Sequence, residues 1–303
     1  MPKRKTRFLR IILSIIACIF FLFPNLCRAQ NSKHSLMLWG AAGYSSFFTK
    51  WDSLNTAGNL GSGVGLGFNI LIMEHLIFSI GIEYLYLNSS IRPVDFSFTR
   101  FNLQDTEGEY YDMKYTLKKF VQIDQTHNFF IPIYLGFKTN LRKLDFFVLA
   151  GGKFGYMFSA RSISKIGSYT TIGEYERFID PFKDMPNHYF TSNQRYNHNN
   201  TLNFNKLQAA ASLELGIELP SVVENNGIRI SFFADYGLLN RQTSAVQKQR
   251  NDLFTFEDIP NIIHVNNLYE TSYKKSTHTA TFFAGLKITL LINISKAPCP
   301  KCL

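Results

Sequence analysis

Apolar and polar residues alternate with a period of two along much of this chain, a pattern typical of β-strands with one buried or lipid-facing side. In the segment 129–138, large apolar residues occupy every odd position, with proline, tyrosine, glycine and lysine between them. Helical periodicity is weak. The alternation predicts eight strands, at Leu36–Phe47, Gly61–Ile72, Ile77–Leu87, Phe129–Lys138, Phe146–Phe158, Leu207–Glu218, Ile228–Leu238 and Thr279–Leu290. Each has about ten residues or more, enough for a tilted strand to cross a bilayer.

The connections between these strands alternate between short and long. The short ones are Met73–His75, Asn140–Lys143 and Pro220–Asn226, and the long ones are Thr49–Leu60, Ser89–Gln125, Arg161–Phe204 and Arg241–Ser276. A soluble sandwich rarely carries several such long loops, whereas outer-membrane barrels combine short periplasmic turns with long outer loops. The sequence therefore predicts an all-β fold: an eight-stranded antiparallel transmembrane β-barrel with short periplasmic turns and long extracellular loops.

The N-terminus has the pattern of a secretory signal peptide: five basic residues within the first ten, an apolar run Ile11–Phe23, and small residues before Gln30. The run is shorter than the roughly 20 residues of a membrane-spanning helix, which disfavours an anchor. Lipid attachment at Cys18 is a second alternative, disfavoured because Ile19–Phe23 would then begin the mature chain. We expect a cleaved signal peptide over 1–29, a barrel over 30–295 and a periplasmic tail over 296–303, which places the protein in the bacterial outer membrane.

Most of the positive charge belongs to this leader. Residues 1–29 hold six Lys and Arg and no acid, so their removal lowers the formal net charge from +10 to about +4. This value does not suggest a nucleic-acid partner. The mature chain keeps two cysteines, Cys299 and Cys302, which offer a metal only two ligands and are candidates for a local disulfide or an inert tail. We expect no metal and no cofactor.

Charged residues of the strands fall on the lumen-facing positions and avoid the lipid-facing ones, where a charge costs a few kcal/mol. Four are acids and four are bases: Glu83, Glu214, Glu218, Asp235, Lys138, Lys153, Arg229 and Lys287. They could form a polar path or proton relay, or a salt-bridged plug. Because eight strands leave an interior just wide enough for side chains, we expect the plug.

Small barrels can also carry hydrolytic sites near the outer rim, and five histidines lie in or near the long loops: His127, His188, His198, His264 and His278. The sequence contains neither Gly-x-Ser-x-Gly nor His-Glu-x-x-His, so no catalytic set can be named. We expect a protein that is not an enzyme. A lipid-modifying barrel enzyme is the least favoured of the functions considered.

The loop 161–204 is rich in aromatic residues among polar ones. Rings with polar neighbours suit a binding surface, and they equally suit the aromatic girdle at the membrane interface. Both interpretations stay open for Tyr175, Phe178, Phe182, Tyr189, Phe190 and Tyr196.

The segment FFIPIYLGFK at 129–138, followed by a short turn and FFVLAGGKFGYMFSA at 146–160, resembles the core of the PorT-like outer-membrane β-barrel family of Bacteroidetes. The resemblance implies a non-enzymatic, accessory role in an outer-membrane protein complex, such as type IX protein secretion. The long loops and the Cys-Pro-Lys-Cys tail depart from the family pattern. We expect a monomeric barrel whose partners are outer-membrane lipid, lipopolysaccharide and outer-membrane or periplasmic proteins.

Pro132 lacks an N–H, so it should mark a bulge or a break in strand pairing.

Overall fold

The computed structural model of this chain describes residues 33–49, 56–72, 75–105, 107–141, 144–183, 185, 190, 194–202, 204–220, 226–241, 254–256, 263–265 and 279–294. The predicted signal peptide and the tail with Cys299 and Cys302 lie outside these residues. Among the described residues there is no helix of the length and hydrophobicity needed to cross a membrane.

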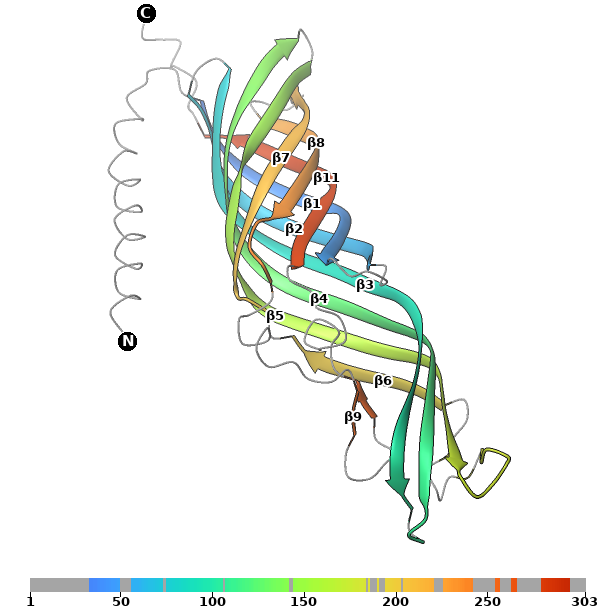
Figure 1. Cartoon of the computed structure of the whole chain (residues 1–303). Coiled ribbons are helices and arrows are strands. Elements are labelled where there is room, and N and C mark those ends of the chain that lie inside the picture. Colours follow the sequence, from blue (N-terminus) through green and yellow to red (C-terminus); the bar gives the residue numbers. More distant parts are fainter. Residues whose placement is uncertain are drawn as a thin grey trace, which may run out of the picture.

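Eight long strands close into a ring. They are β1 (Lys33–Thr49), β2 (Thr56–Leu71), β3 (Leu76–Gln104), β4 (Tyr110–Leu141), β5 (Leu144–Tyr175), β7 (Leu207–Pro220), β8 (Asn226–Gly237) and β11 (Thr279–Asn293). The pairing order is β4-β3-β2-β1-β11-β8-β7-β5, every pair is antiparallel, and a β4–β5 ladder closes the ring. The predicted eight-stranded antiparallel barrel is thereby confirmed (Figure 1).

The strand alternation separates an apolar outer face from a polar inner one. In β8, side chains alternate between exposed and buried along most of the strand. Outward residues such as Leu135, Leu215 and Ile288 are 56%, 48% and 60% exposed, although they are large and apolar. The closed ring satisfies the backbone hydrogen bonds within the wall, so the outer face presents mainly apolar side chains, which lipid can cover. The barrel is a transmembrane barrel of the outer-membrane type.

Short turns connect the strands at one end of the barrel, which is the periplasmic end. β4 ends at Leu141 and β5 begins at Leu144, while β7 ends at Pro220 and β8 begins at Asn226. Ile72, at the end of β2, donates its N–H to the carbonyl of Leu76 at 2.9 Å. These positions agree with the predicted periplasmic turns.

Two segments predicted as outer loops are instead largely strand, and the prediction is wrong there. The segment 89–125 is a hairpin in which β3 runs to Gln104 and β4 begins at Tyr110. In the segment 161–204, β5 continues to Tyr175 and a further strand, β6 (Gln194–Thr201), pairs with it. We call the resulting four-stranded sheet, residues 92–104, 110–126, 160–175 and 194–201, the outer extension. Figure 1 shows it continuing past the ends of the other barrel strands.

Irregularities in the strand pairing explain why the alternation did not reveal the extension. The β3–β4 ladder shifts register between Ile91 and Val94, between Val94 and Phe96, and between Arg100 and Leu103. Each extra residue moves the following side chains to the opposite face, so a strict period of two breaks although the chain remains extended. The short pair β9 (Phe254–Phe256) and β10 (Ile263–Val265) lies within the fourth predicted loop.

Aromatic packing stabilises the extension. The rings of Phe98 and Tyr115 stack at 4.8 Å between centroids, and those of Phe96 and Phe120 meet edge to face at 5.5 Å. Tyr115 and Phe120 are fully buried. Aromatic pairs of this kind contribute about 0.5–1.5 kcal/mol each beyond the area they bury.

Pro132 interrupts the β3–β4 pairing, as expected, but without a bulge. The pairs Ile80–Ile133 and Glu83–Phe130 on either side of it keep the same register. On its other side Pro132 still faces Lys153 of β5. The missing N–H therefore leaves a local gap in one ladder while the wall stays continuous through the other.

Candidate functional site

The lumen contains a cluster of ionised side chains centred on Lys153 of β5. Its Nζ lies 2.6 Å from Oε2 of Glu83 and 2.7 Å from Oδ2 of Asp235. The side chains of these three residues are at most 5% exposed. The ring brings them together from β3, β5 and β8. One cation between two carboxylates leaves this group one negative charge in excess.

The other five predicted lumen residues form two further groups. Lys287 Nζ lies 2.8 Å from Oε2 of Glu214. Glu218 accepts from Arg229 Nε at 2.8 Å and from Lys138 Nζ at 2.6 Å. Both groups lie closer to the periplasmic turns than Lys153 does. Lys138 also pairs with Asp145, a residue that the sequence did not assign to the lumen; its Oδ2 is 2.7 Å from Lys138 Nζ.

Aromatic and hydroxyl groups fill the space between these ion pairs. Trp39 Nε1 donates to Glu83 Oε1 at 3.1 Å, and its ring centroid is 4.8 Å from Lys287 Nζ. The Tyr134 and Ser212 hydroxyls are 3.1 Å apart. The cavity left among Trp39, Tyr134, Lys287 and their neighbours is about 10 Å³, the space of a single water. The arrangement is that of a side-chain plug, with no room for a large solute at this level.

The outer extension ends in an aromatic pocket, which we call the tip pocket. Four of the six predicted aromatic residues meet there: Tyr175, Phe178, Phe182 and Phe190. The Tyr175 ring is perpendicular to those of Phe178 and Phe182, at 6.3 and 5.5 Å. The cavity is about 160 Å³ and is also lined by Met185. Tyr189 lies outside the described residues, as does the side chain of Tyr196, although its backbone is in β6.

Three carboxylates from the β3–β4 turn form the rim of the tip pocket: Asp105, Glu107 and Glu109. The Tyr175 hydroxyl donates to Asp105 Oδ2 at 3.1 Å. Burial, followed by this hydrogen bond and the Asp105 charge, raises the pKa of Tyr175 above its ordinary value. Arg177 pairs with Glu109 at 2.6 Å on the exposed side, so the rim keeps a net negative charge.

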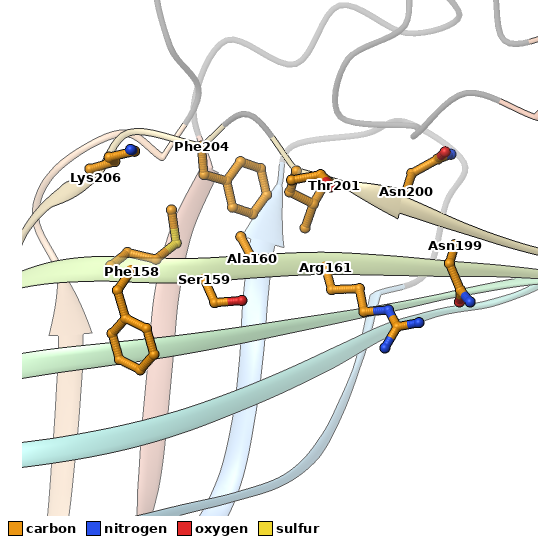
Figure 2. A pocket seen from close by; sticks show the side chains of 11 residues that line it. Phe158, Ser159, Ala160, Arg161, Asn199, Asn200, Thr201, Phe204 and Lys206 are labelled. Atoms are coloured by element: carbon orange, nitrogen blue, oxygen red, sulfur yellow. The ribbon is translucent and has the colours of Figure 1, made fainter.

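A larger cavity, the rim pocket, opens where β5 changes its neighbour. The β5–β7 ladder ends at Tyr156–Leu207 and the β5–β6 ladder begins at Arg161–Thr201. The cavity between them is about 580 Å³ (Figure 2). It is lined by Met157, Phe158, Ser159, Ala160, Arg161, Asn199, Asn200, Thr201, Leu202, Phe204 and Lys206. No acidic side chain is among the described residues of this lining.

Three of the histidines considered as catalytic candidates are described, and each lies on a different strand: His127 in β4, His198 in β6 and His264 in β10. His127 lies on the outer wall, where its Nδ1 is 2.7 Å from the Tyr84 hydroxyl and its ring packs near Phe158. His198 and His264 lie in β6 and β10, and His188 and His278 lie outside the described residues. Within the described residues there is also no group of three or more His, Cys, Asp or Glu suited to a metal ion.

No family model and no curated protein sequence matches this chain. Among solved structures, it is similar to Neisserial surface protein A, with 5% identity, a TM-score of 0.29, and coverage of 84% of this chain and 95% of that chain. It is also similar to Ail, the attachment invasion locus protein of Yersinia pestis, with 8% identity, a TM-score of 0.26, and coverage of 87% and 100%. A third is the translocator domain of the autotransporter NalP from Neisseria meningitidis, at 6% identity, a TM-score of 0.22, and coverage of 92% and 97%.

Proposed function

We propose that this protein is a non-enzymatic outer-membrane barrel that binds a partner outside the cell through the tip of its outer extension. The observation that supports this role best is the tip pocket, where aromatic rings of β5 and the following segment face carboxylates of the β3–β4 turn. Paired strands hold both sides of the pocket, through contacts such as Tyr111–Tyr175. Of the lining residues, Tyr175 lies on a strand, at the end of β5, so strand pairing orders this part of the pocket before binding and reduces the entropy lost on association.

The chemistry of the tip pocket fits a cationic group. Aromatic faces attract ammonium and guanidinium ions through the ring quadrupole, and carboxylates add a Coulomb term. The edge-to-face rings of Phe178 and Phe182, with centroids 5.2 Å apart, form adjacent walls. Glu107 is exposed at the edge of the tip pocket. A lysine or arginine side chain of a partner protein is the occupant we propose.

Replacing Phe178 by alanine should weaken binding of a lysine-rich peptide roughly 2- to 30-fold, because one cation–π partner is lost. Glu107→Gln should weaken it by a smaller factor, since the charge is exposed and screened. Glu174→Gln is the matched control, because Glu174 is exposed on β5 and does not line the pocket. Calorimetric titration of the detergent-solubilised barrel measures all three. Equal affinities for the wild type and the Phe178→Ala variant would exclude this pocket as the site.

A second candidate is an accessory role in an outer-membrane protein complex of the PorT type, for example a complex for protein secretion. Two edges of the outer extension favour it: among the described residues, β3 beyond Ile91 pairs only with β4, and β6 pairs only with β5. Open strand edges are sites where another chain can add a strand. The two segments that resemble the PorT-like family form the adjacent strands β4 and β5.

Deletion of the gene separates the two roles. If the barrel serves type IX secretion, cargo proteins should accumulate in the periplasm, and complementation with the wild-type gene should return them to the culture medium. A Phe178→Ala allele should also restore secretion, because that substitution alters the tip pocket and leaves the strand edges unchanged. Normal secretion in the deletion strain would remove the export role and leave the surface-binding role.

A further inference from the structure

The outward face of the outer extension is strongly basic. This face continues the lipid-facing side of β3, β4 and β5, and the opposite face is buried, for example at Met113, Tyr115 and Leu117. From the barrel wall to the level of Lys114, the exposed charged residues on the described strands of the extension are seven cations and one acid. The acid is Asp95, and the cations, which we call the basic face, are Arg92, Lys114, Lys118, Lys119, Arg161, Lys165 and Arg195.

Two irregularities in strand pairing turn cations toward this face. In β5, Phe158 is an extra residue in the pairing with β4, and Arg161 is exposed as a consequence. In β4, Lys119 has a φ of 57°, a left-handed conformation that residues other than glycine rarely adopt, and both Lys118 and Lys119 are exposed. A strict alternation would turn Arg161 and one of the two lysines to the buried face.

The strand register arranges the cations around Lys165. Lys165 pairs with Val121 of β4, and Arg92 of β3 lies on the other side of Val121, next to the last residue that keeps the β3–β4 register. Two strand spacings separate Arg92 from Lys165, which is roughly 10 Å. Arg195 lies on β6, two residues from the partner of Lys165 and thus roughly 8 Å away, and Arg161 lies roughly 13 Å away along β5. Neighbouring cations of the basic face are therefore spaced for separate anionic groups of one large ligand.

The basic face keeps an excess of positive charge. Every charged residue that the sequence assigned to the lumen has an opposite charge within 2.8 Å. Among the described residues, in contrast, no ion pair involves a cation of the basic face. Asp95 accepts a hydrogen bond from the backbone N–H of Lys119 at 2.9 Å. A surface of this kind attracts an anionic partner.

Aromatic rings on the barrel wall indicate that the basic face begins at the membrane surface. The rings of Phe129 and Phe158 stack at 5.0 Å between centroids, and Tyr84 packs against both, at 5.8 and 6.3 Å. Such rings collect at the boundary between hydrocarbon and headgroups. Arg161 lies three residues beyond Phe158, roughly 10 Å of strand, and Figure 2 shows both side chains on the same side of β5. The other cations of the basic face lie further from the hydrocarbon, on the side of the wall where the surrounding leaflet presents its polar groups.

We propose that the basic face binds the phosphate-bearing saccharide of lipopolysaccharide in the outer leaflet around the barrel. This proposal is independent of the tip pocket. Guanidinium and ammonium groups are the usual partners of phosphate, and clusters of basic residues at a membrane surface bind anionic headgroups. Lipopolysaccharide stands beside the wall at the level of the basic face, with its acyl chains in the same leaflet. A soluble polyanion has no such anchor and would contact the cations alone.

The test is a calorimetric titration of the full barrel in neutral detergent micelles with lipopolysaccharide dissolved in the same detergent. The double variant Arg92→Gln/Lys165→Gln should bind about 30-fold more weakly than the wild type, because each cation near an anionic surface contributes roughly a factor of five. The charge-matched control is Lys183→Gln/Lys206→Gln, since both lysines are exposed and neither lies on a strand of the outer extension. The control should bind as the wild type does.

Two further ligands identify the anion. The wild type should bind lipopolysaccharide stripped of its phosphates at least tenfold more weakly, and dextran sulfate, a soluble polyanion, should also bind more weakly. Unchanged affinity in the double variant, or an equal loss in the control, would overturn the site. Equal affinity for the dephosphorylated form would overturn the role of phosphate, and equal affinity for dextran sulfate would assign the face to a soluble polyanion. Circular dichroism of each variant confirms that the barrel is folded before the titration.

Discussion

Replacing Lys153 by methionine is expected to lower the free energy of unfolding of the barrel by about 3–5 kcal/mol. The substitution keeps most of the side-chain volume and removes the charge. Glu83 and Asp235 would then face each other across the lumen without their shared cation, although both are almost fully buried. Burying a charge without a partner is one of the few single changes with an effect of this size.

Urea unfolding of the barrel in short-chain phosphatidylcholine vesicles measures this change. In a Trp51→Phe background, Trp39 is the single tryptophan, and its fluorescence is a local reporter because the indole N–H donates to Glu83. Adding Glu83→Gln and Asp235→Asn to the Lys153→Met variant should recover much of the loss, since it removes both uncompensated charges. Lys165→Met on the exposed face should change the free energy by no more than about 0.5 kcal/mol. A loss below 1 kcal/mol for Lys153→Met would contradict a structural role for this ion cluster.

The barrel itself could be predicted because each strand carries its own evidence. Alternation in a segment such as 228–238 needs no partner to be recognised, and short connections imply antiparallel neighbours. The ion pairs of the lumen could not be predicted in the same way. Lys153 meets Glu83 and Asp235, which are 70 and 82 residues away, and only the order and register of the closed ring bring them together.

The outer extension was missed for a physical reason. A β-bulge changes which face a side chain occupies, so segments with several bulges lose the period of two on which the strand prediction depends. Trp39 was missed because the alternation in the first strand is less regular: Ser45, Ser46 and Phe47 are consecutive buried residues. From the local sequence alone, the bulged strands of the extension cannot be distinguished from loops, and Trp39 cannot be assigned to the inner face of the first strand.

The tip pocket shows the same division between local and long-range information. Its aromatic residues were predicted as one group because they are close together in the sequence. Asp105, Glu107 and Glu109 were not associated with them, since they belong to a hairpin that was predicted to be a loop. The β4–β5 pairing, for instance Asp112 with Glu174, places the two segments side by side. The acidic edge of the tip pocket is therefore a consequence of the extension, and it is the feature on which the proposed selectivity for cations depends.

An arginine on the lipid-facing side should destabilise the barrel by an amount that depends on its depth in the bilayer. Leu213 is 46% exposed and lies in the middle of β7, where it pairs with Ala150 and Ala234. Leu213→Arg should lower the free energy of unfolding in vesicles by about 2–4 kcal/mol. The matched variant is Ile228→Arg on the same face, near the periplasmic start of β8, and it should lower that free energy by only about 0–1 kcal/mol.

The difference between the two variants tests whether the outer face contacts hydrocarbon. Both remove a large apolar residue of similar exposure and add the same charge, so the loss of apolar contacts is similar in each. What differs is the distance that the guanidinium must extend to reach the headgroups. Equal losses at Leu213 and Ile228 would mean that depth has no effect, which is incompatible with a bilayer around this wall. A loss at Leu213 alone would place the hydrocarbon core at the level of Ala150 and Ala234, between the periplasmic turns and the level of Phe158.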